Sequence, residues 1–374
     1  MQRVPINELR PGMLAARNIY NAESNLLLAA GQRLTSSHIF RLESQKVGSV
    51  YIQNNLLGDA EIPEILQEEM RISSVGEVKK TFSRCKAGEN NEISGLQQVV
   101  GTILDEVMTN RNVMIQLTDI RLYDDYTFAH SVNVCVLSMM LGAALGYSKP
   151  KLQEVGMGAL LHDIGKTLLP PALLNKPGKL TAEEMQTIQT HAMAGFEILR
   201  RERSLPVTVA HVALAHHEKL DGTGYPQQLK DENIPEYSRI VAIVDIYDAI
   251  TSDRPYRSAF LPHEAYNMMM EMSGVHLDPI MLASFFQLVC IYPVGSLVEL
   301  DSGEFAVVTG VYVGMPFRPR LKVFTNACGE KISHPWELDL TEQMAVAIKR
   351  SLRYREFNER FRDIAAEMVN NSVF

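Results

Sequence analysis

Apolar residues recur three or four positions apart through the middle of the chain, from residue 93 to about residue 290. This spacing predicts a series of amphipathic helices that bury one face each. Thr181 and Glu184 form a capping-box pair, and Pro206 suits the first turn of a helix, so two of the helix starts are also marked. We therefore expect a mainly α fold whose largest domain spans residues 93–292. Its helices are expected at residues 96–108, 127–145, 152–166, 181–201, 205–218 and 238–251.

The two flanks have a different texture, with short strand-like runs between turn residues. Residues 1–60 predict a small N-terminal α+β module, in which a strand bends at Gly31 and the segment 36–52 reads as helix, turn and strand. Residues 61–92 predict a helical linker. Residues 293–340 predict a β-hairpin extension, with turns at Ser302-Gly303 and Cys328-Gly329. Residues 341–374 predict a C-terminal helix with a broken apolar stripe. This face is solvated, packs on its own domain or forms a homodimer contact.

Composition narrows the class of protein. A chain of 374 residues with 46% hydrophobic residues suits two or three globular domains. No apolar run approaches the ~18 residues that span a bilayer, and the first residues lack a signal region, so we expect a cytoplasmic protein without membrane insertion. The four cysteines are scattered, as free thiols in a reducing compartment would be. A net charge of −8 argues against binding of a nucleic-acid polymer but allows a small anionic substrate.

Five histidines in the predicted helices carry the first chemical signal. A single histidine on an apolar face is usually a hydrogen-bonded core residue, and we interpret His211 in that way. Several such rings on four helices need a common partner, because burying them unpaired costs free energy. Imidazole nitrogen is the most frequent metal ligand in proteins, so a metal site is favoured. The five are His130, His162, His191, His216 and His217.

Carboxylates in the same helices support this interpretation. Asp163 directly follows His162, and Asp245 and Asp248 lie one turn apart in an apolar helix. Structural salt bridges are the alternative, but Lys166 and Arg254 are the few basic residues nearby in sequence. Two metal ions ~3.5–4 Å apart would clamp a phosphate for in-line displacement.

Three basic side chains follow these acids and suit an anionic substrate. Lys166 lies one helical turn after Asp163, and Arg254 and Arg257 follow the helix that carries Asp245. The planar guanidinium group of arginine matches the oxygen atoms of a phosphate. These three residues are therefore candidate phosphate ligands.

The motifs HDIGK (162–166) and HHEKLDGTGYP (216–226) together resemble the signature of the HD-GYP family, a branch of the HD phosphohydrolases. The resemblance extends over residues 126–291 and includes YTFAHS, KPGKLTAEE, HAMAGFEIL and DIYDAITSDRPYR. The segments LRPGM and LLLAAGQRL resemble a small module that often precedes these domains. The resemblance implies a helical, metal-dependent phosphodiesterase that hydrolyses cyclic di-GMP to pGpG, GMP or both through a metal-bridging hydroxide.

The resemblance also implies a ligand set. One ion would take His130, His162 and Asp245. The second ion would take His191, His216 and His217, and Asp163 would bridge the two ions, with Asp163 and Lys166 as the catalytic residues. Some members carry a glutamate where this chain has Tyr126, so two ions rather than three are expected. Iron or manganese is favoured, and nickel, zinc and cobalt are the alternatives.

The substrate and partners follow in the same way. Lys166, Arg254 and Arg257 would hold cyclic di-GMP, while Tyr225 would line the substrate cleft or a partner surface. A diguanylate cyclase (GGDEF) domain that docks on the GYP turn is an expected partner, and a homodimer is another. An HD phosphohydrolase acting on another nucleotide and a non-catalytic cyclic di-GMP scaffold are the alternative functions.

Overall fold

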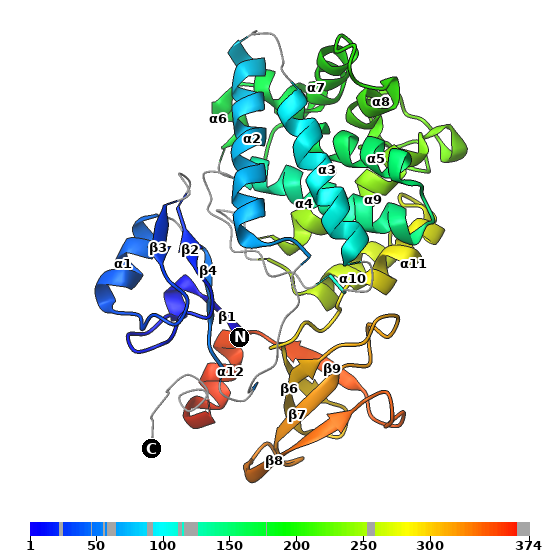
Figure 1. Ribbon diagram of the computed structural model, residues 1–374. Helices are drawn as coiled ribbons and strands as arrows, with labels where there is room; N and C mark the ends of the chain where they lie inside the picture. The colour runs from blue at the N-terminus through cyan, green and yellow to red at the C-terminus, as the bar shows by residue number, and fades with distance from the viewer. Residues whose placement is uncertain are drawn as a thin grey trace.

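The computed structural model describes residues 1–21, 25–45, 47–54, 57, 65–87, 93–110, 114–115, 126–176, 178–252 and 259–364. Figure 1 shows three parts: a helical domain, a small N-terminal module and a C-terminal sheet, with the last two on the same side of the helical domain.

The N-terminal module has the expected order of helix, turn and strand. Its core is formed by apolar residues that point inward from β4 and α1, such as Val50 and Leu42. Gly31 has φ +76°, which fits the bend that the sequence predicts after the LLL strand. Strand β1 pairs antiparallel with β4, and β2 pairs with β3. The elements are β1 (Gln2–Pro5), η1 (Ile6–Glu8), β2 (Ile19–Tyr20), β3 (Leu26–Leu28), α1 (Ser36–Ser44) and β4 (Ser49–Ile52).

Helix α2 (Glu68–Ala87) follows this module in the chain and packs against the helical domain, where it contacts α3, α4 and η4. Val78 and Phe82 are buried, and the Phe82 ring meets Phe128 edge to face with centroids 5.7 Å apart. The Thr167 hydroxyl lies 4.0 Å from the Cys85 sulfur. The predicted linker is therefore a packed part of the domain over the residues of α2.

The helical domain follows the predicted pattern closely, from α3 to α11. Each expected helix is present, and buried apolar residues such as Leu152, Val212 and Val244 form its core. The elements are α3 (Ser94–Thr109), α4 (Tyr126–Ala144), α5 (Lys149–Leu161), η4 (Ile164–Leu168), α6 (Pro171–Leu174), α7 (Ala182–Leu199), α8 (Val207–Ala215), η5 (Asp231–Asn233), α9 (Glu236–Thr251), α10 (Pro262–Met270) and α11 (Pro279–Leu288).

Helix α4 is the central helix of this domain and contacts α2, α3, α5, α9 and α11. Its window Thr127–Ala144 has a mean hydropathy of 1.4, which is apolar enough for a membrane span, but 67% of the window is buried inside the protein. The same helix carries His130. These features are those of the core helix of a folded domain, where apolar residues contact other helices instead of lipid.

The C-terminal region corrects the prediction from sequence. The expected hairpins are present as β5-β6 and β7-β8, but they belong to a five-stranded antiparallel sheet with the order β8-β7-β6-β5-β9. The expected helix from residue 341 is wrong over its first part, because β9 pairs there with β5, and Leu352 lies opposite Leu297. The predicted turns are present, and Gly303 and Gly329 adopt positive φ. The elements are β5 (Leu297–Leu300), β6 (Phe305–Gly310), β7 (Arg320–Thr325), β8 (Lys331–Asp339), β9 (Ile348–Leu352) and α12 (Tyr354–Arg360).

The first and last parts of the chain lie side by side (Figure 1). Helix α12 contacts β1, and Arg355 lies 4.0 Å from Glu8. Gly295 lies against the Met1 carbonyl, at a place where a Cβ atom would come within 2.3 Å of that oxygen. Close backbone packing therefore joins the N-terminal module to the C-terminal sheet.

Candidate metal centre

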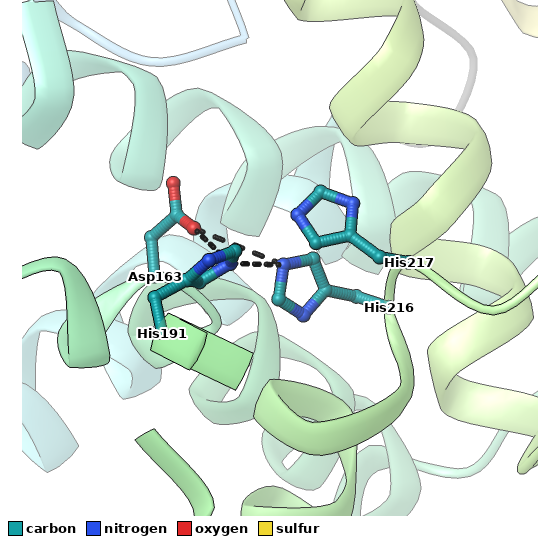
Figure 2. Close-up of side chains that lie close together, drawn as sticks. All are labelled: Asp163, His191, His216 and His217. Carbon is teal, nitrogen blue, oxygen red and sulfur yellow. Dashed lines mark hydrogen bonds and ion pairs between the residues drawn. The ribbon is translucent and has the colours of Figure 1, made fainter. Parts of the chain in front are cut away.

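The seven predicted ligands lie together inside the helical domain. They form two groups, and within each group the ligand atoms lie within 4.8 Å of one another. The first group is His130, His162 and Asp245, and the second is Asp163, His191, His216 and His217. Figure 2 shows the second group, with the three rings and the Asp163 carboxylate converging on one point.

Asp163 lies between the two groups. Its Oδ2 is 3.3 Å from His162 Nε2, and its Oδ1 is 3.4 Å from His191 Nε2 and 3.8 Å from His216 Nε2. The residue is placed there by the end of α5, where His162 still has helical dihedrals and Asp163 leaves the helix before η4. One carboxylate therefore faces ligand nitrogens of both groups.

A glycine contact holds this turn against α7. A Cβ atom on Gly165 would lie 2.0 Å from the His191 carbonyl oxygen and 2.6 Å from the Gly195 amide nitrogen. Any larger residue would push η4 away from α7 and would separate Asp163 from His191. The glycine of HDIGK is therefore a packing requirement of the site.

Three of the rings are held in one tautomer by the backbone of their own helices. The Nδ1 atoms of His162, His191 and His216 lie 2.7–3.1 Å from carbonyl oxygens three or four residues earlier. Because a carbonyl only accepts, each Nδ1 carries the hydrogen, and each Nε2 presents a lone pair to the interior.

These lone pairs face one another without a donor between them. His191 Nε2 lies 3.4 Å from His216 Nε2. The buried His162 Nε2 and Asp163 Oδ1 have no hydrogen-bond partner among the described residues. Buried lone pairs on nitrogen and carboxylate oxygen need a cation when no donor among the described residues satisfies them. The donor set therefore fits divalent transition-metal ions.

The charge states of the site also suit a cation. Burial lowers the pKa of His217 to about 3, and burial with its histidine neighbours keeps the pKa of His216 well below its ordinary value. The carboxyl group of Asp163 has a pKa well below its usual range, because Lys166 and His162 outweigh its burial. Neutral imidazoles and ionised carboxylates are the forms that bind metal.

His130 responds in the opposite direction. Burial lowers its pKa, but hydrogen bonds to Asp245 and Asp248 outweigh burial and raise the pKa to about 10. Its Nε2 is 3.0 Å from Asp245 Oδ1, and its Nδ1 is 2.6 Å from Asp248 Oδ2. The carboxylates of Asp245 and Asp248 thus stabilise positive charge on the His130 ring, and a cation between His130 Nε2 and Asp245 would be stabilised in the same way.

His216 and His217 stand at the end of α8, where the chain leaves the helix. Their ring centroids are 4.0 Å apart with planes at 44°, so the two adjacent histidines approach the second group from different directions. The Tyr225 ring lies on His217, with centroids 4.7 Å apart. Tyr225 was predicted to line a cleft or a partner surface, and here its ring covers a candidate ligand.

The turn that carries Tyr225 is fastened to the same helix end. Glu218 is buried, and its carboxylate accepts hydrogen bonds from the amides of Gln227 at 2.7 Å and Leu229 at 3.0 Å. A Cβ atom on Gly224 would come within 2.6 Å of the His217 carbonyl oxygen. The turn contains a cis Tyr225-Pro226 bond. The glycine and Glu218 together keep Tyr225 on His217.

A cavity of about 260 Å³ is lined by members of both groups. Lys166 is on its wall, with a side chain that is 30% exposed and an ammonium group that contacts Asp163 Oδ2. Arg254 and Arg257 lie outside the described residues, and so does the side chain of Tyr126. The described lining residues are Thr127, His130, Asp163, Lys166, His217, Asp245, Ile246 and Ala249.

Three contacts of the site go beyond the prediction from sequence: Asp248 supported a metal site there without a specific role, and Asn133 and Glu218 were not singled out. Asp248 and Glu218 carried a signal, because each is an acid close in sequence to a predicted ligand. Asn133 carried none, since its amide meets Asp248 only through the packing of α4 on α9.

Comparison with known proteins gives the following matches. Residues 112–281 match the HD domain family, and residues 297–360 match a KOW domain associated with HD domains. A cyclic di-GMP phosphodiesterase of Pseudomonas aeruginosa is 38% identical over 268 residues, which cover 70% of this chain and 64% of that protein. A 3'3'-cGAMP-specific phosphodiesterase of Vibrio cholerae is 40% identical over 154 residues, which cover 41% of this chain and 33% of that protein.

A solved structure has the same fold. An HDG"Y"P protein from Bdellovibrio bacteriovorus gives a TM-score of 0.50 at 19% identity, covering 76% of this chain and 97% of that one. At this identity the likeness concerns the fold alone. The chain spans less than two thirds of the length of both sequence relatives.

Proposed function

We propose that this chain is a metal-dependent phosphodiesterase of the HD-GYP type that hydrolyses cyclic di-GMP. Its match to the HD domain family over residues 112–281 and its 38% identity to a cyclic di-GMP phosphodiesterase of Pseudomonas aeruginosa support the proposal. One observation carries the proposal: among the described residues, the buried His162 Nε2 and Asp163 Oδ1 have no hydrogen-bond donor, and the Nε2 atoms of His191 and His216 face each other beside them. The products would be pGpG, GMP or both.

In this proposal His130, His162 and Asp245 hold one ion, His191, His216 and His217 hold a second, and Asp163 serves both. The ions would act as Lewis acids that activate water and the phosphoryl group. Iron or manganese suits the mixed nitrogen and oxygen ligands, and nickel, zinc or cobalt would fit the same donors.

Lys166 would neutralise the phosphate. Its ammonium group contacts Asp163, but a side chain that is 30% exposed on the cavity wall can turn toward a bound anion. A preorganised cation beside the scissile phosphate stabilises the charge that develops in the transition state. Positive charge from the ions would repel the ammonium group from Asp163 and favour this movement.

The volume of the cavity indicates which part of the substrate it can hold. About 260 Å³ lies below the ~300–1,000 Å³ of sites that enclose a whole drug-sized ligand. We infer that one phosphodiester enters the cavity while the guanines lie outside it. Arg254 and Arg257 remain candidates for contacts with these outer parts of the substrate.

A second cyclic dinucleotide, 3'3'-cGAMP, is an alternative substrate. A relative in Vibrio cholerae carries the name of a 3'3'-cGAMP-specific phosphodiesterase, and its matching region includes the HD domain. A cavity that admits only the phosphodiester would accept either cyclic dinucleotide. A non-catalytic scaffold is the other alternative, and docking of a GGDEF domain on the GYP turn, a homodimer and a cytoplasmic location remain predictions.

Product chromatography tests the proposal. The chain, loaded in turn with Fe²⁺ and Mn²⁺, is incubated with cyclic di-GMP, 3'3'-cGAMP and bis(p-nitrophenyl) phosphate. We expect cyclic di-GMP to be cleaved fastest and chelator-treated protein to be inactive. His211→Ala serves as the control, because His211 stacks on Phe196 outside both groups. Binding of cyclic di-GMP without any product from metal-loaded protein would support the scaffold and reject the enzyme.

A further inference from the structure

The two candidate metal subsites differ in the groups that hydrogen-bond to the outer nitrogen, Nδ1, of their histidine ligands. We propose that Asp248 is a positioning residue that clamps His130 and makes the subsite of His130, His162 and Asp245 the tighter one, so that an ion loads there first. The inference deepens the proposed function, because it rests on two ions binding at these residues. Asp248 itself would touch neither the ion nor the substrate.

Helix α9 holds both nitrogens of the His130 ring. Asp245 faces Nε2 at 3.0 Å, and Asp248, one turn later, faces Nδ1 at 2.6 Å. The Asp248 side chain is fully buried. Its other oxygen accepts a hydrogen bond of 3.1 Å from the Asn133 amide, which comes from α4, the helix of His130. The carboxylate is therefore fixed from both helices, and the ring cannot turn without breaking a contact.

The other histidines with a fixed Nδ1 have a weaker partner. His162, His191 and His216 donate from Nδ1 to neutral backbone carbonyls. A hydrogen bond to a carboxylate is about twice as strong as one to a neutral acceptor. It also increases the electron density on the opposite nitrogen, which makes Nε2 a better metal ligand. Among these rings, His130 is the one whose Nδ1 meets a carboxylate.

The balance of charge favours the same subsite. The first subsite has the carboxylate of Asp245, a share of Asp163, and Asp248 directly behind His130. The second subsite has three imidazoles and its share of Asp163. Lys166 opposes this difference, because its ammonium group contacts the Asp163 oxygen that faces His162. Once the incoming ion has displaced the proton of His130, two additional carboxylates stand against one partly exposed ammonium group among the described residues. This leaves the first subsite more negative, and a divalent cation binds there more tightly.

Metal titration of the full chain tests the inference without any measurement of hydrolysis. Chelator-treated protein is titrated with Co²⁺, followed by calorimetry and by the visible absorption of the bound ion. For the natural sequence we expect a tight and a weak binding event. For Asp248→Asn we expect the tight event to weaken by ~10–100-fold, the usual effect of losing an outer partner of a ligand, while the weak event stays unchanged.

Asp278→Asn is the matched control. Asp278 pairs with Arg239 of α9 at 2.8 Å and lies outside both metal groups, so the variant perturbs the same helix with the same substitution. Both of its binding events should keep their affinities. Asn133→Ala is a second variant in case Asp248→Asn does not fold, and it should weaken the tight event by a smaller factor.

Three outcomes would overturn the inference. These are equal affinities for both ions in the natural sequence, an unchanged tight event in both Asp248→Asn and Asn133→Ala, and an equal loss of both events in Asp248→Asn. Failure of the proposed function looks different. A chain that binds two ions stepwise but cleaves no cyclic dinucleotide would reject the enzyme and leave this inference standing.

Discussion

At the scale of single residues, Asp163 has the most demanding environment. It is a buried carboxylate whose neighbours are three imidazoles and one ammonium group. Burial of an ionised carboxylate is costly unless positive charge lies beside it. In the chain alone, Lys166 supplies that charge, and in the proposed enzyme the metal ions would supply most of it.

Removal of the shared carboxylate should therefore disrupt both subsites. For Asp163→Ala we expect at most one bound ion per chain and no turnover, because each ion loses a ligand that the backbone turn presents in a fixed position. Elemental analysis of the purified variant checks this, with His211→Ala as the control that keeps its ions. Two ions per chain in Asp163→Ala would show that the carboxylate does not bridge.

Lys166→Ala should separate chemistry from metal binding. We expect the variant to keep its ions and to lose turnover by ~10²-fold or more, the effect of one lost transition-state contact. KM for cyclic di-GMP should change less than kcat. Steady-state kinetics with saturating metal gives both constants, and a turnover equal to that of the natural sequence would leave Lys166 with the electrostatic role at Asp163 only.

At the scale of elements, the sequence predicts the helices and the gathering of ligands better than their division of labour. Polar residues within apolar helices mark the ligands, because burial without a partner would be unfavourable. Asp245 and Asp248 are equivalent in such a pattern, and only the packing of α9 on α4 decides which of them faces Nε2. Neither Arg254 nor Arg257 lies within the described residues, so both stay predictions.

The missed strand has a different cause. In β9, IKRSL is short and follows a turn-rich segment, and its partner β5 lies about 50 residues earlier in the chain. Long-range strand pairing leaves little trace in local periodicity. The charged residues of this segment were read as one face of a helix, whereas Lys349 and Arg350 pair with Glu299 across the sheet.

The GYP turn gives a prediction at this scale. Glu218→Gln keeps the size of the side chain but replaces one accepting oxygen by a donor, so one of the amides of Gln227 and Leu229 loses its partner. An unsatisfied buried donor costs ~1–3 kcal/mol. We expect faster hydrogen exchange across residues 224–229 with little change elsewhere. Glu232→Gln is an exposed control, and equal exchange in both variants would contradict the role of Glu218.

At the scale of the whole molecule, α2 joins the N-terminal module to the region of the site. Phe82 meets Phe128, two residues before His130, and Cys85 lies beside Thr167, next to Lys166. Helix α2 thus contacts α4, which contains the candidate ligand His130, and η4, which contains the candidate catalytic residue Lys166. A displacement of α2 would therefore shift α4 and η4, and with them His130 and Lys166.

The contact between the two rings can be measured with a double-mutant cycle. Phe82→Leu and Phe128→Leu keep apolar bulk but remove the edge-to-face pair, whose coupling we expect at ~0.5–1.5 kcal/mol. Denaturant unfolding of the natural chain, both single variants and the double variant gives this energy. Strict additivity would mean that α2 rests on α4 without a specific aromatic contact.

The candidate ligands come from α4, the end of α5, α7, the end of α8 and α9, so bound ions would have a second consequence. Each ion would cross-link separate elements, the first of them from His130 to Asp245, more than a hundred residues apart. At a free concentration 100-fold above its Kd, a bound ion adds ~2.7 kcal/mol to stability. Unfolding, and with it digestion by proteases, should therefore quicken as the metal supply falls. Pulse proteolysis across a series of buffered Mn²⁺ concentrations would record this as a half-life that shortens as the concentration of Mn²⁺ falls. A cell short of metal would then lose the protein itself by degradation, as well as any activity that depends on the ions.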